Sequence, residues 1–240
     1  MRKLFVIALA LVTSLTAFSQ TTKEAKNKEV LSRAGDHLML QISSDHWMGA
    51  PDSVSSHIKG FSRGLNVYFM LNKAFKADPR FSVAFGLGVG SSNIYFKRMY
   101  VDIAATRSTL PFDQQDTLSH FKKFKVSNSF LEIPIEFRFT SDPVNPNKAI
   151  KVALGAKVGT MLNAHSKGKI FQSNSGSTIN NYTSKVTTKS YFNTTRIAAT
   201  ARIGYGNFTL FGAYSFSSIF KDAVAADIRL LQVGITFSGL

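Results

Sequence analysis

Five histidines are the residues of this sequence best suited to acid–base or metal chemistry: His37, His46, His57, His120 and His165. The last four fall in or beside segments that we expect to be loops, where a Ser–His–Glu set acting on lipid could be assembled. No pair has a metal-ligand spacing such as H-x-x-x-H, and no serine stands in a recognisable nucleophile turn. We therefore expect ordinary polar loop residues, with no catalytic residue, no metal and no cofactor. A lipid-modifying enzyme is the alternative.

A second group of charged side chains lies in FLEIPIEFRF, residues 130–139. Apolar residues occupy every odd position from 131 to 139, and Glu132, Pro134, Glu136 and Arg138 stand between them. Strict alternation over ten residues predicts a β-strand with one apolar face. Since proline has no N–H to give to a neighbouring strand, we expect a local bulge or a widened ladder at Pro134.

Seven further segments alternate in the same way, and each is close to the roughly 9–11 residues that a tilted strand needs to cross a bilayer. They are HLMLQIS at 37–43, GLNVYFMLN at 64–72, FSVAFGLGVG at 81–90, AIKVALGAKVG at 149–159, RIAATARIGY at 196–205, NFTLFGAYSF at 207–216 and RLLQVGITF at 229–237. The eight segments predict an all-β fold, an eight-stranded antiparallel up-and-down transmembrane barrel.

The connections between these segments alternate in length. Three are short and rich in Pro, Asp, Asn or Gly, at 73–80, 141–148 and 205–207. The others are longer, at 45–61, 96–126, 166–192 and 217–227. Short periplasmic turns and longer outer loops are typical of barrels in the outer membrane. The polar stretch 172–185 within the third long connection is expected to be mobile.

The first residues predict export. Arg2 and Lys3 precede an apolar core, and Ala17 and Ser19 stand where a signal peptidase cleaves. We expect a signal peptide over 1–19, a flexible periplasmic lead-in over 20–35 and an outer-membrane β-barrel over 36–240. The chain has no cysteine, so burial and strand pairing alone must hold the exported fold.

The formal net charge of +15 raises the question of nucleic-acid binding. The chain carries an export signal, and its basic residues are scattered singly along the sequence, so we expect no nucleic-acid partner. Internal ion pairs and anionic lipid head groups fit better. The expected partners are outer-membrane lipids and lipopolysaccharide, together with other envelope or secretion proteins.

A soluble eight-stranded barrel that carries a ligand is the structural alternative. Its strands would show the same alternation, with the apolar residues facing inward instead of outward. The second face of the segments at 81–90 and 149–159 is rich in glycine and alanine. Such residues destabilise a solvated strand, whereas inside a narrow barrel they leave room for long side chains. We therefore expect a plugged lumen held by a polar cluster of Glu132, Glu136, Arg138, Lys151, Lys157, Arg196 and Arg202.

Aromatic residues near the ends of the expected strands predict girdles at the two membrane interfaces. They are Tyr68, Phe75, Tyr95, Phe96, Tyr100, Phe130, Tyr205, Tyr214 and Phe220.

The segment LEIP at 131–134, the Pro/Asn turn after it and ALGAKVG at 153–159 resemble the PorT-like outer-membrane β-barrel family of Bacteroidetes. The resemblance implies an outer-membrane barrel without a catalytic motif. It also implies a role as an interaction or assembly component of the cell envelope. The member that gives the family its name takes part in type IX secretion, so the resemblance implies that process as well.

Overall fold

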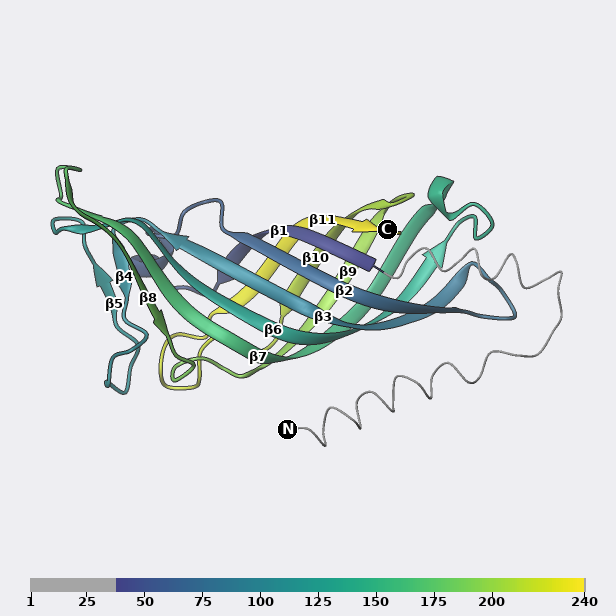
Figure 1. Ribbon diagram of the computed structural model, residues 1–240. Helices are drawn as coiled ribbons and strands as arrows, with labels where there is room; N and C mark the ends of the chain where they lie inside the picture. The colour runs from purple at the N-terminus through teal and green to yellow at the C-terminus, as the bar shows by residue number, and fades with distance from the viewer. Residues whose placement is uncertain (1–37, 240) are drawn as a thin grey trace, which may run out of the picture. The chain divides into compact units, whose positions relative to one another are not determined.

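The structure is a computed structural model that describes residues 38–239. The signal peptide and lead-in expected at 1–35, and His37, lie outside the described residues. Eight long strands of the described chain form the barrel (Figure 1). They are β1 (Leu38–Met48), β2 (Arg63–Ala74), β3 (Phe81–Phe96), β6 (His120–Thr140), β7 (Ile150–Gln172), β9 (Thr195–Tyr205), β10 (Phe208–Ser215) and β11 (Arg229–Ser238).

The barrel is closed by hydrogen bonding between its first and last strands. β1 pairs antiparallel with β2 on one side and with β11 on the other, and β6 joins β3 to β7. Every neighbouring pair around the ring is antiparallel. The predicted eight-stranded up-and-down barrel is therefore confirmed. We call the end with the short connections and both described chain ends the inner end, and the opposite end the outer end.

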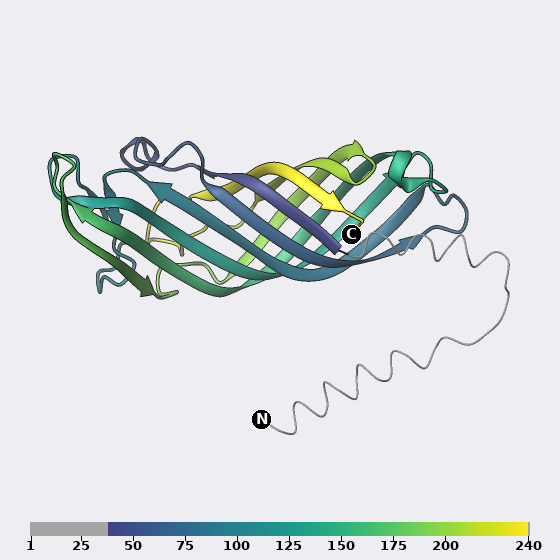
Figure 2. The ribbon, with the colours of Figure 1, turned by 45° about the horizontal axis from the view of Figure 1, so that its top comes forward.

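β6 and β7 are the longest strands, with 21 and 23 residues, and they continue past the rest of the barrel at the outer end (Figure 2). A further strand, β8 (Thr178–Thr187), pairs with the outer part of β7. We call His120–Ser129, Asn163–Gln172 and β8 the outer arm. The polar stretch expected to be a mobile loop is thus largely a hairpin, because Thr, Tyr, Ile and Val favour a strand beside the free edge of β7.

The remaining elements are short. They are the two-stranded sheet of β4 (Met99–Val101) and β5 (Phe112–Gln114), the helix α3 (Asp52–Ser55) and the 3₁₀ turn η2 (Pro146–Lys148). Within residues 38–239, no helix has the length and apolar character needed to cross a membrane.

The apolar rows of the strands face outward. Phe85 is 50% exposed, Leu154 61% and Val233 52%, while the residues that alternate with apolar ones on β6 are buried. This is the burial pattern of a barrel in lipid, with apolar residues outside and polar ones inside. A soluble carrier would turn the apolar rows inward, so that alternative is wrong.

Of the two alternatives expected at Pro134, a bulge or a widened ladder, the structure shows an interrupted ladder and no bulge. Pro134 stands opposite Lys157 in an uninterrupted register with β7. On the other side, the pairing of β6 with β3 stops at Ile135 and resumes at Glu132 without a register shift. The ladder is interrupted because Pro134 has no N–H, and no residue is inserted. The register shift between β6 and β7 lies instead between Ser129 and Phe130, where the outer arm begins.

Candidate functional site

The centre of the barrel holds a buried ion-pair network around Glu132, a side chain with no exposed surface. Arg196 of β9 donates to its carboxylate from Nε at 2.9 Å and from Nη2, and the Lys157 ammonium of β7 lies 3.3 Å away. The Tyr68 hydroxyl of β2 donates to the same carboxylate. Four strands are therefore tied together by one acid, and its charge is compensated where no water reaches it.

A second layer lies four residues along β6 towards the inner end. Arg202 of β9 donates to Glu136 from Nη2 at 2.6 Å, and Arg138 donates from Nε at 2.9 Å. The Arg202 guanidinium also lies 3.4 Å from the Thr209 hydroxyl of β10. Lys151 is half-buried at the inner mouth, where it lines a cavity of about 30 Å³ together with Arg138 and Arg202. Of the seven residues predicted for the lumen, the structure thus places six in these two layers and Lys151 at the rim.

One charged residue of the interior, Asp45, was absent from the predicted cluster. Asp45 of β1 is 1% exposed and accepts hydrogen bonds from Ser43 and, at 3.1 Å, from Gln232. Gln232 in turn accepts from Lys157 at 3.2 Å, which links Asp45 to the Glu132 network. Asp45 was assigned to a loop, but it lies four residues after the lumen-facing Gln41, so continued alternation would have placed it inside.

Glycines make room for the Glu132 network. A Cβ on Gly90 of β3 would lie 2.5 Å from the Glu132 Oε2 atom, and one on Gly159 of β7 would lie 2.8 Å from its Cγ atom. Neither position can accept a larger residue without displacing the carboxylate. The small residues on the lumen face therefore leave the space that the few long, charged side chains beside them occupy.

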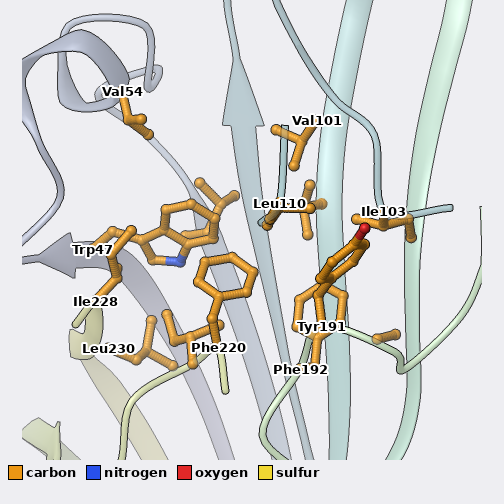
Figure 3. Close-up of a cluster of buried hydrophobic side chains, with 14 of the residues drawn as sticks. Trp47, Val54, Val101, Ile103, Leu110, Tyr191, Phe192, Phe220, Ile228 and Leu230 are labelled. Atoms are coloured by element: carbon orange, nitrogen blue, oxygen red, sulfur yellow. The ribbon is translucent and has the colours of Figure 1, made fainter. Parts of the chain in front are cut away.

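The outer half of the interior is apolar. Trp47 of β1 meets the rings of Phe96 and Phe220 edge to face, each at 5.5 Å between centroids. Figure 3 shows the Trp47 and Phe220 rings next to each other. The outer connections contribute Val101, Ile103 and other apolar residues to the same cluster. We call this cluster the outer core. Its buried members are Trp47, Val54, Ile94, Phe96, Met99, Val101, Ile103, Leu110, Phe124, Val126, Phe130, Met161, Ala164, Tyr191, Phe192, Ile219, Phe220, Ile228 and Leu230.

The outer core corrects part of the predicted aromatic girdle. Phe96, Phe130 and Phe220 are at most 4% exposed and belong to the outer core, and Tyr68 is 1% exposed in the polar lumen. An aromatic near a strand end is an interface residue only if it faces outward. Tyr205, at 58% exposed, meets that condition.

Hydrogen bonds fix the outer connections to one another. The Tyr191 hydroxyl lies 2.6 Å from the Ala105 carbonyl oxygen and 2.7 Å from that of Arg107. The Leu110 N–H donates to the Val224 carbonyl at 2.9 Å. Three separate connections are therefore joined over the outer core, which gives the outer end a defined surface.

Among the described histidines, His57 has the neighbours of a Ser–His–Asp set. Ser56, His57 and Asp116 are in contact, with 3.1 Å between Ser56 Oγ and His57 Nδ1 and 3.1 Å between His57 Nε2 and Asp116 Oδ2. However, the Ser56 hydroxyl donates to the Asp52 carbonyl at 2.7 Å, and His57 Nδ1 lies 3.0 Å from the Ser53 carbonyl. That nitrogen must carry a hydrogen, so it cannot accept the proton of the serine as a general base must.

The other described histidines lie apart. His46 contacts Ser44, His120 contacts the Leu118 carbonyl and Gln172, and His165 contacts Asn163. Residues 38–239 contain no group of three His, Cys, Asp or Glu side chains placed to hold a metal ion.

The sequence matches the family model described as outer membrane protein beta-barrel domain over residues 18–221, which is most of the chain. The chain belongs to this family. As a member of the outer membrane protein beta-barrel domain family, the protein lies in the outer membrane, and its apolar rows face lipid.

Two crystal structures of Ail, the attachment invasion locus protein of Yersinia pestis, are also similar to the chain. One of them is in complex with the heparin analogue sucrose octasulfate. The identities are 12% and 13%, the TM-scores 0.31 and 0.33, and each match covers 83% of this chain and 95% of the Ail chain. No curated protein matches the chain. The family assignment rests on the family match and the strand topology.

Proposed function

We propose that the protein is a non-catalytic interaction component of the cell envelope that uses its outer arm to contact other envelope molecules. The observation that carries the proposal is the length of β6 and β7 beyond the lipid-facing rows. β7 runs twelve residues, Met161–Gln172, past the end of its ladder with β9, which is about 40 Å of strand. β6 accompanies it and runs four residues, His120–Lys123, past the end of its ladder with β3. A strand that only crosses the membrane does not need this extension.

The packing beneath the arm supports a display role. Phe124 and Val126 of β6 and Ala164 of β7 anchor the arm in the outer core. The contact surface is therefore built on rigid elements, and little conformational entropy is lost when a partner binds.

The interior supports a role that is neither transport nor catalysis. The polar layers and the outer core fill the barrel, and the cavities beside Arg138 and Arg196 measure about 30 and 10 Å³. These volumes hold one or two water molecules at most. The one Ser–His–Asp contact set in the described chain has its hydroxyl and its imidazole committed to backbone carbonyls.

The finer part of the proposal is participation in type IX secretion. Its support is the resemblance of LEIP at 131–134 and ALGAKVG at 153–159 to PorT-like barrels. Since the outer arm offers a protein partner an exposed strand, β8, the same surface serves an assembly role in that machinery.

Shortening the arm tests the proposal. Gly168 and Ser184 face each other across the β7–β8 ladder, so residues 169–183 can be replaced by the two-residue turn Asn-Gly. We expect the variant to fold in the outer membrane yet to behave like a gene deletion. The measurements are export of surface proteins and resistance of the envelope to detergent in a complemented deletion strain.

A matched control shortens a hairpin at the inner end. The Ser141 N–H donates to the Ile150 carbonyl at 3.0 Å, so residues 142–149 can likewise be replaced by Asn-Gly. This control should complement the deletion as the wild type does. Full complementation by the arm-shortened variant would contradict the display role, and normal export in the deletion strain would contradict the secretion role.

A further inference from the structure

Lysines that are far apart in the sequence stand opposite one another on the outer arm. Lys125 of β6 pairs directly with Lys167 of β7, and Lys167 pairs with Lys185 of β8. Lys123 and Lys169 form a second pair, two residues further out. Neighbouring strands are about 4.8 Å apart, so these five side chains form a grid of like charges. We call them the lysine grid.

Like charges directly opposite each other destabilise a sheet unless something compensates them. Among the described residues, no carboxylate forms an ion pair with a lysine of the grid. The residues of the outer arm, His120–Ser129, Asn163–Gln172 and β8, include no Asp or Glu. The neutral Asn93 amide oxygen accepts a hydrogen bond from Lys125 at 2.6 Å. The compensating negative charge therefore has to come from outside the described chain.

The grid surrounds a hollow of about 230 Å³ on the surface of the arm. Its lining consists of Lys123, Lys125, Lys167 and Lys169 together with Tyr95 and Phe124. The Phe124 side chain itself is buried in the outer core. The hollow is large enough for a phosphate group and part of the sugar that carries it. The Lys125 Nζ atom lies 5.8 Å from the centroid of the Tyr95 ring, which provides an aromatic wall.

The charges of the grid act on one another. Burial, and then the neighbouring Lys167, Lys169 and Lys185, lower the pKa of Lys125 below its usual value. Burial and the same kind of lysine neighbours also lower the pKa of His165 beside the grid. A bound anion would relieve this repulsion.

The grid faces sideways, away from the outer core. Phe124 and Val126, which alternate with its β6 lysines, are buried in the outer core, so Lys123 and Lys125 point to the same side as Leu131 and the other lipid-facing residues. Between the lipid-facing row and the lysines, the β6 residues on this side are the buried Ser127 and the partly buried Ser129. A partner on this face stands beside the barrel, where the head groups of outer-leaflet lipids rise above the hydrocarbon.

We propose that the lysine grid binds the phosphate-bearing sugar head groups of the outer-leaflet lipids that surround the barrel. The proposal rests on the outer arm being the contact surface proposed above, and it names one partner of that surface. Opposing lysines supply several positive charges to neighbouring phosphates, and the Tyr95 wall packs against the sugar.

Lipid retention by the purified full-length chain tests the grid. The protein is reconstituted in phosphatidylcholine nanodiscs that contain a small fraction of lipopolysaccharide, extracted in a nonionic detergent and purified. The retained lipopolysaccharide is then quantified by mass spectrometry. Because each lysine near an anionic surface contributes about 1 kcal/mol, we expect K125Q/K167Q to retain at least about tenfold less lipopolysaccharide than the wild type.

Three comparisons make the result specific. K73Q/K76Q removes two exposed lysines at the inner end and should retain lipopolysaccharide as the wild type does, whereas K125R/K167R keeps both charges and should also retain it. Dephosphorylated lipopolysaccharide should show no difference between the wild type and K125Q/K167Q. Heat-modifiable gel migration checks that each variant is folded.

Equal retention by K125Q/K167Q and K73Q/K76Q overturns the proposal. So does a wild type that retains no lipopolysaccharide but binds dextran sulfate in lipopolysaccharide-free nanodiscs, because the anion would then be a soluble chain. The proposed function fails separately, since it is measured by complementation in cells. If the arm-shortened variant complements the deletion while K125Q/K167Q loses the lipid, the lipid site stands and the display role fails.

Discussion

At the residue scale, Glu132 has the most consequential environment, because Arg196 and Lys157 both depend on it for compensation. We expect Glu132→Gln to lower the free energy of unfolding by about 3 kcal/mol, since it leaves two buried cations without their acid. Urea unfolding of the detergent-folded barrel, followed by tryptophan fluorescence and gel migration, measures the change. Asp222→Asn removes an exposed carboxylate and serves as the control.

A double variant shows whether Glu132→Gln destabilises the barrel because buried cations lose their compensating charge or because the side-chain packing changes. Adding Lys157→Met to Glu132→Gln removes one of the stranded cations, so the double variant should be more stable than Glu132→Gln alone. If Glu132→Gln unfolds at the same urea concentration as Asp222→Asn, the ion pairs contribute nothing to stability.

The face of a single side chain can be deduced from the sequence, but its partner cannot. Alternation predicts which side of a strand Glu132 and Tyr68 occupy, and the girdle assignment of Tyr68 failed because its parity was overlooked. The contact of Glu132 with Arg196 depends on register and barrel shear, which a single strand does not reveal. The same limit hid the lysine grid, because Lys125, Lys167 and Lys185 look scattered until their strands pair.

At the scale of elements, Pro134 marks a weak point in the ladder between β3 and β6. Pro134→Val supplies the missing N–H in a strand-favouring residue, so we expect it to raise the free energy of unfolding by about 1 kcal/mol. Urea unfolding measures the change, and amide exchange of neighbouring residues should slow as well. Pro143→Val, in the inner connection 141–149, is the control. If Pro134→Val is less stable, the packing of the proline ring stabilises the barrel by more than the missing hydrogen bond destabilises it.

The eight crossing strands could be predicted because lipid imposes a period of two on each of them. The outer core and the outer arm could not, because their residues follow no such period. Met99, Val101, Ile103 and Leu110 become apolar core only when the outer connections fold over the barrel. β8 likewise has a polar composition, and it forms a strand because the longer β7 offers it an edge.

At the scale of the whole molecule, the interior has two different seals in series. The inner seal is the polar network of Glu132, Glu136 and their cations, and the outer seal is the outer core around Trp47 and Phe220. The two layers differ in chemistry. Toward the inner end, charged side chains must be compensated within a narrow ring of strands, whereas toward the outer end the interior is filled by apolar residues of the outer connections. Residues 169–183 at the tip of the outer arm contribute nothing to the outer core, so shortening the arm there leaves the barrel closed.

This arrangement predicts that the protein does not conduct ions. The purified wild type in planar lipid bilayers should show no stable conductance steps, because an ion would have to pass two layers that leave cavities of about 30 Å³ or less beside Arg138 and Arg196. Trp47→Ala opens the outer seal alone and should remain silent, since the Glu132 layer still fills the cross-section. The arm-shortened variant should be silent as well. Reproducible conductance steps from the wild type would show that the polar layer yields to solvent, and that the barrel is a gated pore instead of a fixed platform for its outer arm.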